Sequence, residues 1–107
     1  MALTRNAKIA VVERVHRDPD FAKALLDEAA TLFLNGEPHT ARLILRDLVE
    51  AVVGFETLAA ETGKARRSLQ RMLSTEGNPS MDDLAAILGV VRGKLGVELA
   101  AHTVEAA

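Results

Sequence analysis

Apolar residues recur along most of the chain with the three- and four-residue spacing of a helix face, which predicts an almost entirely helical protein. The clearest example follows Asp18-Pro19, a pair typical of an N-cap and the first position of a helix. Asn35-Gly36 is typical of a helix end and predicts its stop. The predicted apolar stripe between these signals consists of Phe21, Leu25, Ala29, Leu32 and Phe33.

A second helix is predicted from Pro38 to Val53, closed by Gly54. The expected buried residues are Ala41, Ile44, Leu45, Leu48 and Val52, and the expected outer residues are Arg42, Arg46, Asp47 and Glu50. Arg42 and Arg46 lie one turn apart, where they can either touch phosphate or pair with carboxylates. Upstream, a weaker pattern from Thr4 to Arg17 predicts a further helix.

Two short apolar segments follow, on either side of Gly63. The first, Phe55 to Thr62, is too short to be stable as an isolated helix, so it must pack against its neighbour. A sharp turn favours a positive φ at Gly63, which only glycine adopts at little cost. This spacing predicts a helix-turn-helix over residues 55–73, in which the touching positions are Leu58, Ala59, Leu69 and Met72.

The second of these short helices is strongly basic, although the chain has a formal net charge of -2. Residues 62–73 contain four of the thirteen Lys and Arg residues and no acidic residue. Arginine can bind guanine O6 and N7 with two hydrogen bonds, glutamine can do the same for adenine, and Lys or Ser can bind phosphate. The predicted residues that contact duplex DNA are Lys64, Arg66, Arg67, Ser68, Gln70 and Arg71. A merely solvated basic helix face is the alternative interpretation.

Downstream, the segment Glu76-Gly77-Asn78-Pro79 predicts a turn. Ser80 is typical of an N-cap, with a carboxylate at the third helical position, Asp83. The core face of the helix that begins here is expected to hold Met81, Leu84, Ala85 and Leu88.

Beyond Gly89, the glycines at 93 and 96 are expected to break helical continuity, so residues 94–99 form either a short strand or a helix end. The chain is expected to comprise an N-terminal helix or arm over 1–17, one helical DNA-binding domain over 18–99, and a frayed tail over 100–107. Its length suits one domain, and its 49% apolar content suffices for a core.

These motifs resemble the helix-turn-helix core of the antidote (antitoxin) proteins of toxin-antitoxin addiction modules, within the lambda-repressor-like (Xre-type) class. The resemblance covers roughly residues 18–99 and is carried by Leu58-Ala59, Glu61-Thr62-Gly63, Ser68-Leu69, Arg71, Leu73-Ser74 and Gly77-Asn78-Pro79. One departure is Lys64-Ala65, where relatives often have a small apolar residue and then a Ser that caps the second helix. The resemblance implies an all-α fold, a lambda-repressor-like helix-turn-helix bundle with additional N-terminal helices and a short extended C-terminal tail.

The resemblance implies a sequence-specific transcriptional repressor that binds a double-stranded DNA operator. By analogy with such proteins, a homodimer would read two half-sites about 34 Å apart. Neutralisation of a cognate toxin is a second implied role, although no residue identifies a surface for it. The alternative is a protein-interaction module that binds a toxin or another partner without reading DNA.

Other classes of function are disfavoured by composition. The absence of cysteine excludes disulfides, thiolate catalysis and cysteine-based zinc sites. The three histidines are scattered without the spacing of a metal site, so no enzyme, metal or cofactor is predicted. With three Phe and no Tyr or Trp, binding of single-stranded nucleic acid by stacking is disfavoured. The N-terminus lacks the pattern of a secretory signal, and no run approaches the roughly 18 apolar residues that span a bilayer, so a cytoplasmic location is expected.

Overall fold

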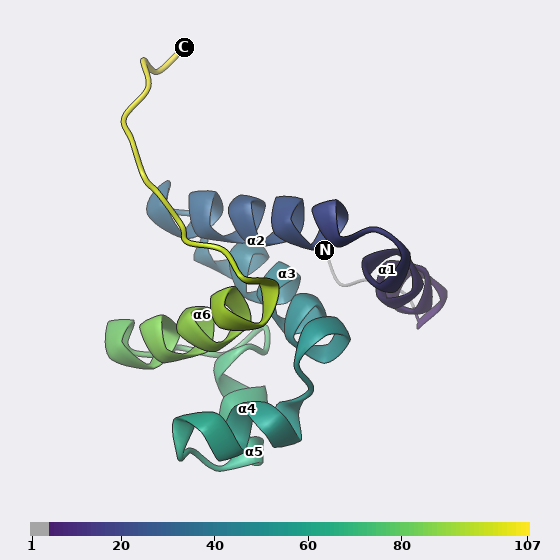
Figure 1. Ribbon diagram of the computed structural model, residues 1–107. Coiled ribbons are helices and arrows are strands. Elements are labelled where there is room, and N and C mark those ends of the chain that lie inside the picture. The colour runs from purple at the N-terminus through teal and green to yellow at the C-terminus, as the bar shows by residue number, and fades with distance from the viewer. Residues whose placement is uncertain (1–4) are drawn as a thin grey trace.

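The computed structural model describes residues 5–107, with side chains from residue 9 onward, and this part of the chain folds into six α-helices (Figure 1). Their bounds are α1 Arg5–Arg17, α2 Pro19–Leu34, α3 Pro38–Val52, α4 Phe55–Thr62, α5 Arg66–Met72 and α6 Met81–Leu95. No β-strand occurs between residues 5 and 107. The expected all-α class is confirmed, and Thr4, the predicted first residue of the N-terminal helix, lies outside the described residues.

The helix ends follow the local signals in the sequence. At the start of α2 the Asp18 carboxylate accepts a hydrogen bond from the Asp20 backbone N–H at 3.2 Å, and Pro19 takes the first helical position. At the start of α6 the Ser80 hydroxyl accepts from the Asp83 backbone N–H at 3.0 Å. Both predicted N-caps are therefore confirmed, since each satisfies a backbone donor that the helix itself leaves unpaired.

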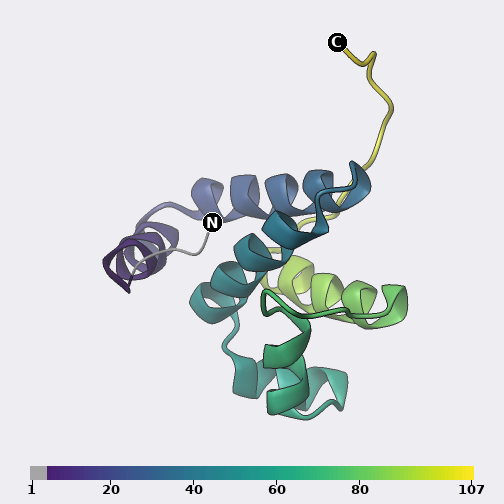
Figure 2. The ribbon, with the colours of Figure 1, turned by 180° about the vertical axis from the view of Figure 1, so that it is seen from behind.

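The helices pack around α3, which contacts α1, α2, α4 and α6. Figures 1 and 2 show α2, α3 and α6 forming the body, with α1 beside it and the α4–α5 pair at one end. The largest fully buried side chains come from α2 to α6 and the residue after α5: Leu26, Leu45, Leu48, Val49, Leu58, Leu69, Leu73, Ile87 and Val91. One apolar core therefore joins the α4–α5 pair to the rest of the molecule.

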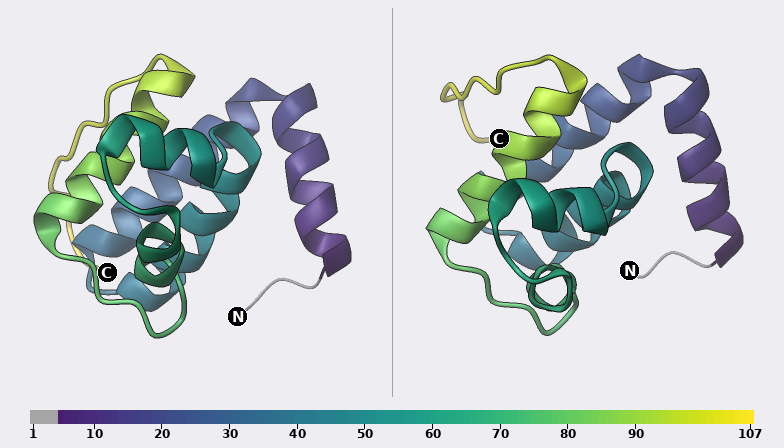
Figure 3. Two further views of the ribbon diagram at one scale, coloured as in Figure 1. Left: turned by 90° about the horizontal axis from the view of Figure 1, so that it is seen from below. Right: turned by 60° about the horizontal axis from the view of Figure 1, so that its bottom comes forward.

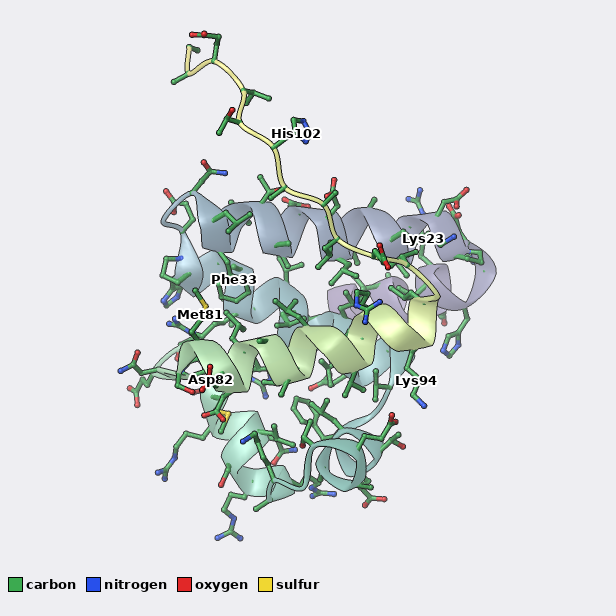
Figure 4. All side chains as sticks on the ribbon, turned by 60° about the vertical axis from the view of Figure 1, so that its left-hand side comes forward. Lys23, Phe33, Met81, Asp82, Lys94 and His102 are labelled. Carbon is green, nitrogen blue, oxygen red and sulfur yellow. The ribbon has the colours of Figure 1, made fainter. Side chains whose placement is uncertain are left out.

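The expected core face of α6 was partly wrong. Leu84 is buried, but Met81 is 78% exposed and Ala85 is also exposed, while the buried positions are Leu84, Ile87 and Val91. These three residues share one helix face, and Ala85 lies at its flank. Met81 lies in the exposed first turn of α6 (Figure 4).

The expected break at Gly93 was also wrong, whereas the expected break at Gly96 is confirmed. The helix passes through Gly89 and Gly93 and stops at Leu95, followed by Gly96 with a φ of +67°. A glycine inside a helix costs about 1 kcal/mol relative to alanine, and the packing of Val91 and Leu95 against the core offsets that cost. Residues 96–99 form neither helix nor strand, so the question left open for 94–99 is settled as a helix end.

The buried faces of α3 and α2 also differ from those expected. Asp47 is buried rather than outside, because neighbouring helices enclose α3 on several sides. On α2 the fully buried residues include Ala22 and Leu26, whereas Phe21 and Leu25 are only partly buried against the core. The contact with α3 and α6 therefore favours a helix face rotated slightly from the predicted stripe.

Residues 100–107 have no regular secondary structure and are exposed. This tail leaves the body beside α2, at the end of the molecule opposite the α4–α5 pair (Figures 1 and 2).

Candidate nucleic-acid interface

The helices α4 and α5 are joined by a three-residue turn, Gly63 to Ala65. Gly63 has the expected positive φ, +70°, and its N–H donates to the Ala59 carbonyl at 2.9 Å. Figure 3 shows α5 nearly end-on while α4 runs across the view, so the two helices cross rather than lie alongside each other. The sequence correctly predicted the two helices and the glycine between them.

Side chains on the inner faces of the pair hold α5 in place. Leu58, Leu69 and Leu73 are fully buried. Ala59 and Met72 are partly buried and pack against the same core. A seven-residue helix gains too little from its own backbone bonds to persist alone, so these contacts determine its position.

The outer face of α5 carries the predicted DNA-contacting residues. Those on the helix itself are all exposed: Arg66, Arg67, Ser68, Gln70 and Arg71. No side chain caps the start of α5 at Ala65, as expected from the departure at Lys64-Ala65.

Lys64 differs from the other predicted contacts because it lies in the turn before α5 and its side chain forms a close ion pair. Its ammonium lies 2.7 Å from the carboxylate of Asp83, and the two side chains are only 31% and 26% exposed. The hydrogen bond from Lys64, with further hydrogen bonds from Ser80, holds the pKa of Asp83 below its ordinary value. This ion pair fastens the turn between α4 and α5 to the start of α6.

Arg66 is also paired, but more loosely. Its guanidinium donates to the Glu56 carboxylate at 3.2 Å, and the two side chains are 56% and 86% exposed. An ion pair this exposed contributes at most about 1 kcal/mol, so Arg66 can exchange Glu56 for another anion at small cost.

Arg67 and Arg71 are the cations of this helix whose side chains make no hydrogen bond or ion pair with any described residue. They lie one helical turn apart and line an open groove of about 430 Å³. The remaining lining residues are Ser68, Met72, Glu76, Gly77 and Asn78. The groove therefore has α5 as one wall and the loop after α5 as the other.

The loop wall packs closely against the end of α5. A Cβ atom on Gly77 would collide with the backbone carbonyl oxygens of Met72 and Arg71, so only glycine fits this approach. Asn78 and Glu76 were not among the predicted contacts. The turn around them was visible in the sequence, but only the fold brings it beside Arg67 and Arg71.

The two arginines of α3 have different partners. Arg42 donates to the backbone carbonyls of Ser74 and Thr75 at 3.3 and 3.4 Å, a contact that neither sequence alternative included. Arg46 lies 3.7 Å from the carboxylate of Glu50, one turn away on the same helix, as one alternative expected.

From residue 9 onward, where side chains are described, the other polar groups form no comparable site. His16 lies with its Nε2 3.3 Å from the Ala51 carbonyl, between α1 and α3. Across the described residues, no group of three or more His, Cys, Asp or Glu side chains is placed to hold a metal ion. None of the helices described is long and apolar enough to cross a membrane.

Comparison of the chain with protein-family models, with curated proteins and with solved structures found no match. The resemblance to the antidote proteins therefore stays a prediction.

Proposed function

We propose that the protein is a sequence-specific, double-stranded DNA-binding regulator of transcription, in which α4 and α5 act as a helix-turn-helix and α5 enters the major groove. The observation that carries this proposal is the pair Arg67 and Arg71, exposed one turn apart and free of acidic partners among the described residues. Two unpaired guanidinium groups on one helix face suit an anionic partner, since each has five donors in a fixed geometry.

The groups around this pair support duplex DNA as the anion. Ser68 and Gln70 are exposed on the same short helix, and both can bind base edges or phosphate oxygens. A single α-helix fits the width of the major groove, and α5 lies at the end of the molecule with the tail at the other end (Figure 1).

The contacts of these side chains support different roles within the predicted set. Arg67 and Arg71 are the proposed base-reading residues, and Arg66 is a proposed phosphate contact once Glu56 releases it. Lys64 is proposed to position the turn through Asp83 rather than to read DNA.

One α5 helix contacts only a few base pairs, so we propose that the protein acts as a homodimer. Two copies would place two such helices in successive major grooves, about 34 Å apart, on a palindromic operator.

The test is selection of binding sites from a random pool of DNA duplexes, followed by affinity measurements on the enriched site. We expect a palindrome to be enriched, and Arg67→Ala or Arg71→Ala to weaken binding by about 1 to 3 kcal/mol, or roughly 5- to 150-fold, with relaxed preference at one base position. Lys23→Ala is the matched control. It removes one exposed positive charge from α2, on the far side of α6 from α4 and α5 (Figure 4), and should leave the affinity nearly unchanged.

Absence of any enriched site, with circular dichroism showing a folded helical protein, would contradict the proposal. The chain would then be better explained as an interaction module, and the same arginine variants would be assayed for binding to a protein partner.

A further inference from the structure

Arg42 connects two distant parts of the chain. It lies on α3 and donates from Nε to the Ser74 carbonyl at 3.3 Å and from a terminal nitrogen to the Thr75 carbonyl at 3.4 Å. The partners are 32 and 33 residues away in the sequence and directly follow α5. One side chain therefore joins the central helix of the fold to the end of the basic helix.

The carbonyls that Arg42 binds lie where the chain leaves α5. At that point, Ser74 bonds back to the Arg71 carbonyl through both its N–H, at 3.1 Å, and its hydroxyl, at 2.7 Å. The Ser74 carbonyl also accepts from the Gly77 N–H at 3.1 Å. Because carbonyls beyond a helix end have no helical partner, a guanidinium that binds two of them fixes the exit path of the chain.

This exit path forms one wall of the groove beside Arg67 and Arg71. The loop continues from Thr75 into Glu76, Gly77 and Asn78, which face the two arginines across the groove. Gly77 already packs against the last carbonyls of α5 with no space for a Cβ. A loop displaced at Ser74 and Thr75 would therefore change the width of the groove and the direction of the α5 arginines.

We propose that Arg42 is a positioning residue for DNA recognition, which holds the loop at 74–78 against α5 and so sets how Arg67 and Arg71 meet the bases. This inference rests on the proposed function. Arginine suits the role because its planar guanidinium donates in two fixed directions at once, whereas lysine offers a compact charge on a flexible stem.

The experiment compares Arg42→Met, Arg42→Lys and Arg46→Met. Methionine retains most of the apolar stem, so packing is largely preserved. Arg46→Met is the matched control because it removes the same charge from the same helix, one turn away, but its partner is Glu50 of its own helix. Affinity is measured for the duplex enriched by selection and for a scrambled duplex of equal length, and the ratio of the two affinities gives the discrimination.

We expect Arg42→Met to reduce the discrimination about tenfold, an effect comparable with the loss of one base contact, and Arg42→Lys to restore only part of it. Arg46→Met should leave the ratio unchanged. Both methionine variants should weaken binding to the scrambled duplex by a similar small factor, since each loses one positive charge. Hydrogen exchange at the Ser74 and Gly77 amides should become faster only in the Arg42 variants.

Equal discrimination by Arg42→Met and Arg46→Met would overturn the inference, even if amide exchange in the loop became faster, because Arg42 would then be only structural. If the unaltered protein itself shows no discrimination, the proposed function is wrong and the positioning role is wrong with it. If the wild type discriminates between the two duplexes and Arg42→Met discriminates equally well, only the positioning role is refuted.

Discussion

The four cations between residues 62 and 73 look equivalent in the sequence but have different surroundings in the fold. Lys64 is committed to Asp83 at 2.7 Å, and Arg66 is shared with Glu56 at 3.2 Å. Arg67 and Arg71 have no such partner among the described residues. The charge that α5 can offer to a ligand is therefore concentrated on one pair of side chains.

The exposed pair of Arg66 and Glu56 leads to a prediction about affinity. Glu56→Gln should strengthen binding to any DNA duplex by up to about fivefold, because it frees Arg66 and removes a negative charge near the proposed interface. Fluorescence anisotropy with a labelled duplex measures the effect.

Glu28→Gln provides the matched control, because Glu28 is an exposed carboxylate on α2 and its replacement changes the net charge by the same amount. Equal effects of the two substitutions would mean that overall charge, rather than the release of Arg66, is responsible.

The pair of Lys64 and Asp83 leads to a prediction about pH. The folded state holds the pKa of Asp83 below that of the unfolded chain, so the folded state binds this proton less readily. The stability that Asp83 contributes is therefore fully present above its pKa in the unfolded chain, about 3.9. It is lost as the pH falls through the lower pKa that Asp83 has in the folded state.

We expect Asp83→Asn to be less stable than the wild type at neutral pH, and the two to converge as the pH falls below about 4. Urea unfolding followed by circular dichroism across the acid range gives both curves. The substitution retains the backbone N–H that Ser80 caps, so the helix start is not otherwise altered. Parallel curves at every pH would show that Asp83 has no linkage to folding.

At the scale of the elements, α5 depends on its neighbours for its existence. It has seven residues, and its fixed points are Leu69 within the helix, Leu73 just after it, and the glycine turns on either side. The loop after α5 matters as much as the turn before it, because Gly77 packs directly on the last carbonyls of the helix.

Gly77→Ala should destabilise the protein by about 1 to 3 kcal/mol, since the added methyl group must displace backbone atoms of Arg71 and Met72. Gly89→Ala is the matched control: it adds the same methyl group inside α6, where there is open space, and should stabilise by about 0.5 to 1 kcal/mol. Both values follow from chemical denaturation. A loss in both variants, or in neither, would contradict the assigned packing of Gly77.

The elements also show what the sequence could predict. The starts of α2 at Asp18 and of α6 at Ser80, and the turn at Gly63, were correctly predicted. Helix caps and glycines with a positive φ depend only on residues a few positions away in the sequence. The burial of Asp47 and the exposure of Met81 were not predicted, since each depends on which helix lies alongside.

In the candidate site, too, local features were predicted from the sequence, whereas contacts between distant residues were not. The exposure of the basic residues of α5 followed from helical periodicity. The ion pair between Lys64 and Asp83, and the hydrogen bonds from Arg42 to the loop after α5, join residues far apart in the chain. No local pattern encodes such contacts, so the ion pair of Lys64 and the contacts behind the proposed role of Arg42 could be found only in the fold.

At the scale of the whole molecule, a chain with a net charge of -2 has its proposed DNA-binding helix at one end and its extended tail at the other (Figure 1). Binding to a polyanion must then depend on few local contacts, because the remaining surface is not basic overall.

The salt dependence of binding should report the number of those contacts. Each arginine that neutralises a phosphate should contribute about -0.9 to the slope of log affinity against log salt concentration. The slope for one copy should therefore lie between about -1, if Arg66 alone meets a phosphate, and about -3, if Arg67 and Arg71 also lie near phosphates, and roughly twice that for a dimer. Titrations of the enriched duplex at several salt concentrations, with the mass of the complex from sedimentation, separate the two cases. A slope near zero would contradict an interface built on these arginines.

Different residues hold α5 against the core and form its exposed face. Leu69, Leu73 and Gly77 are buried, while positions 66, 67, 70 and 71 are exposed. Surface substitutions at those four positions cost little stability, usually within about 0.5 kcal/mol. In the proposed function, a lineage that carries this fold can therefore change the DNA sequence that α5 reads by single mutations without first losing the fold, so new binding preferences are within short evolutionary reach.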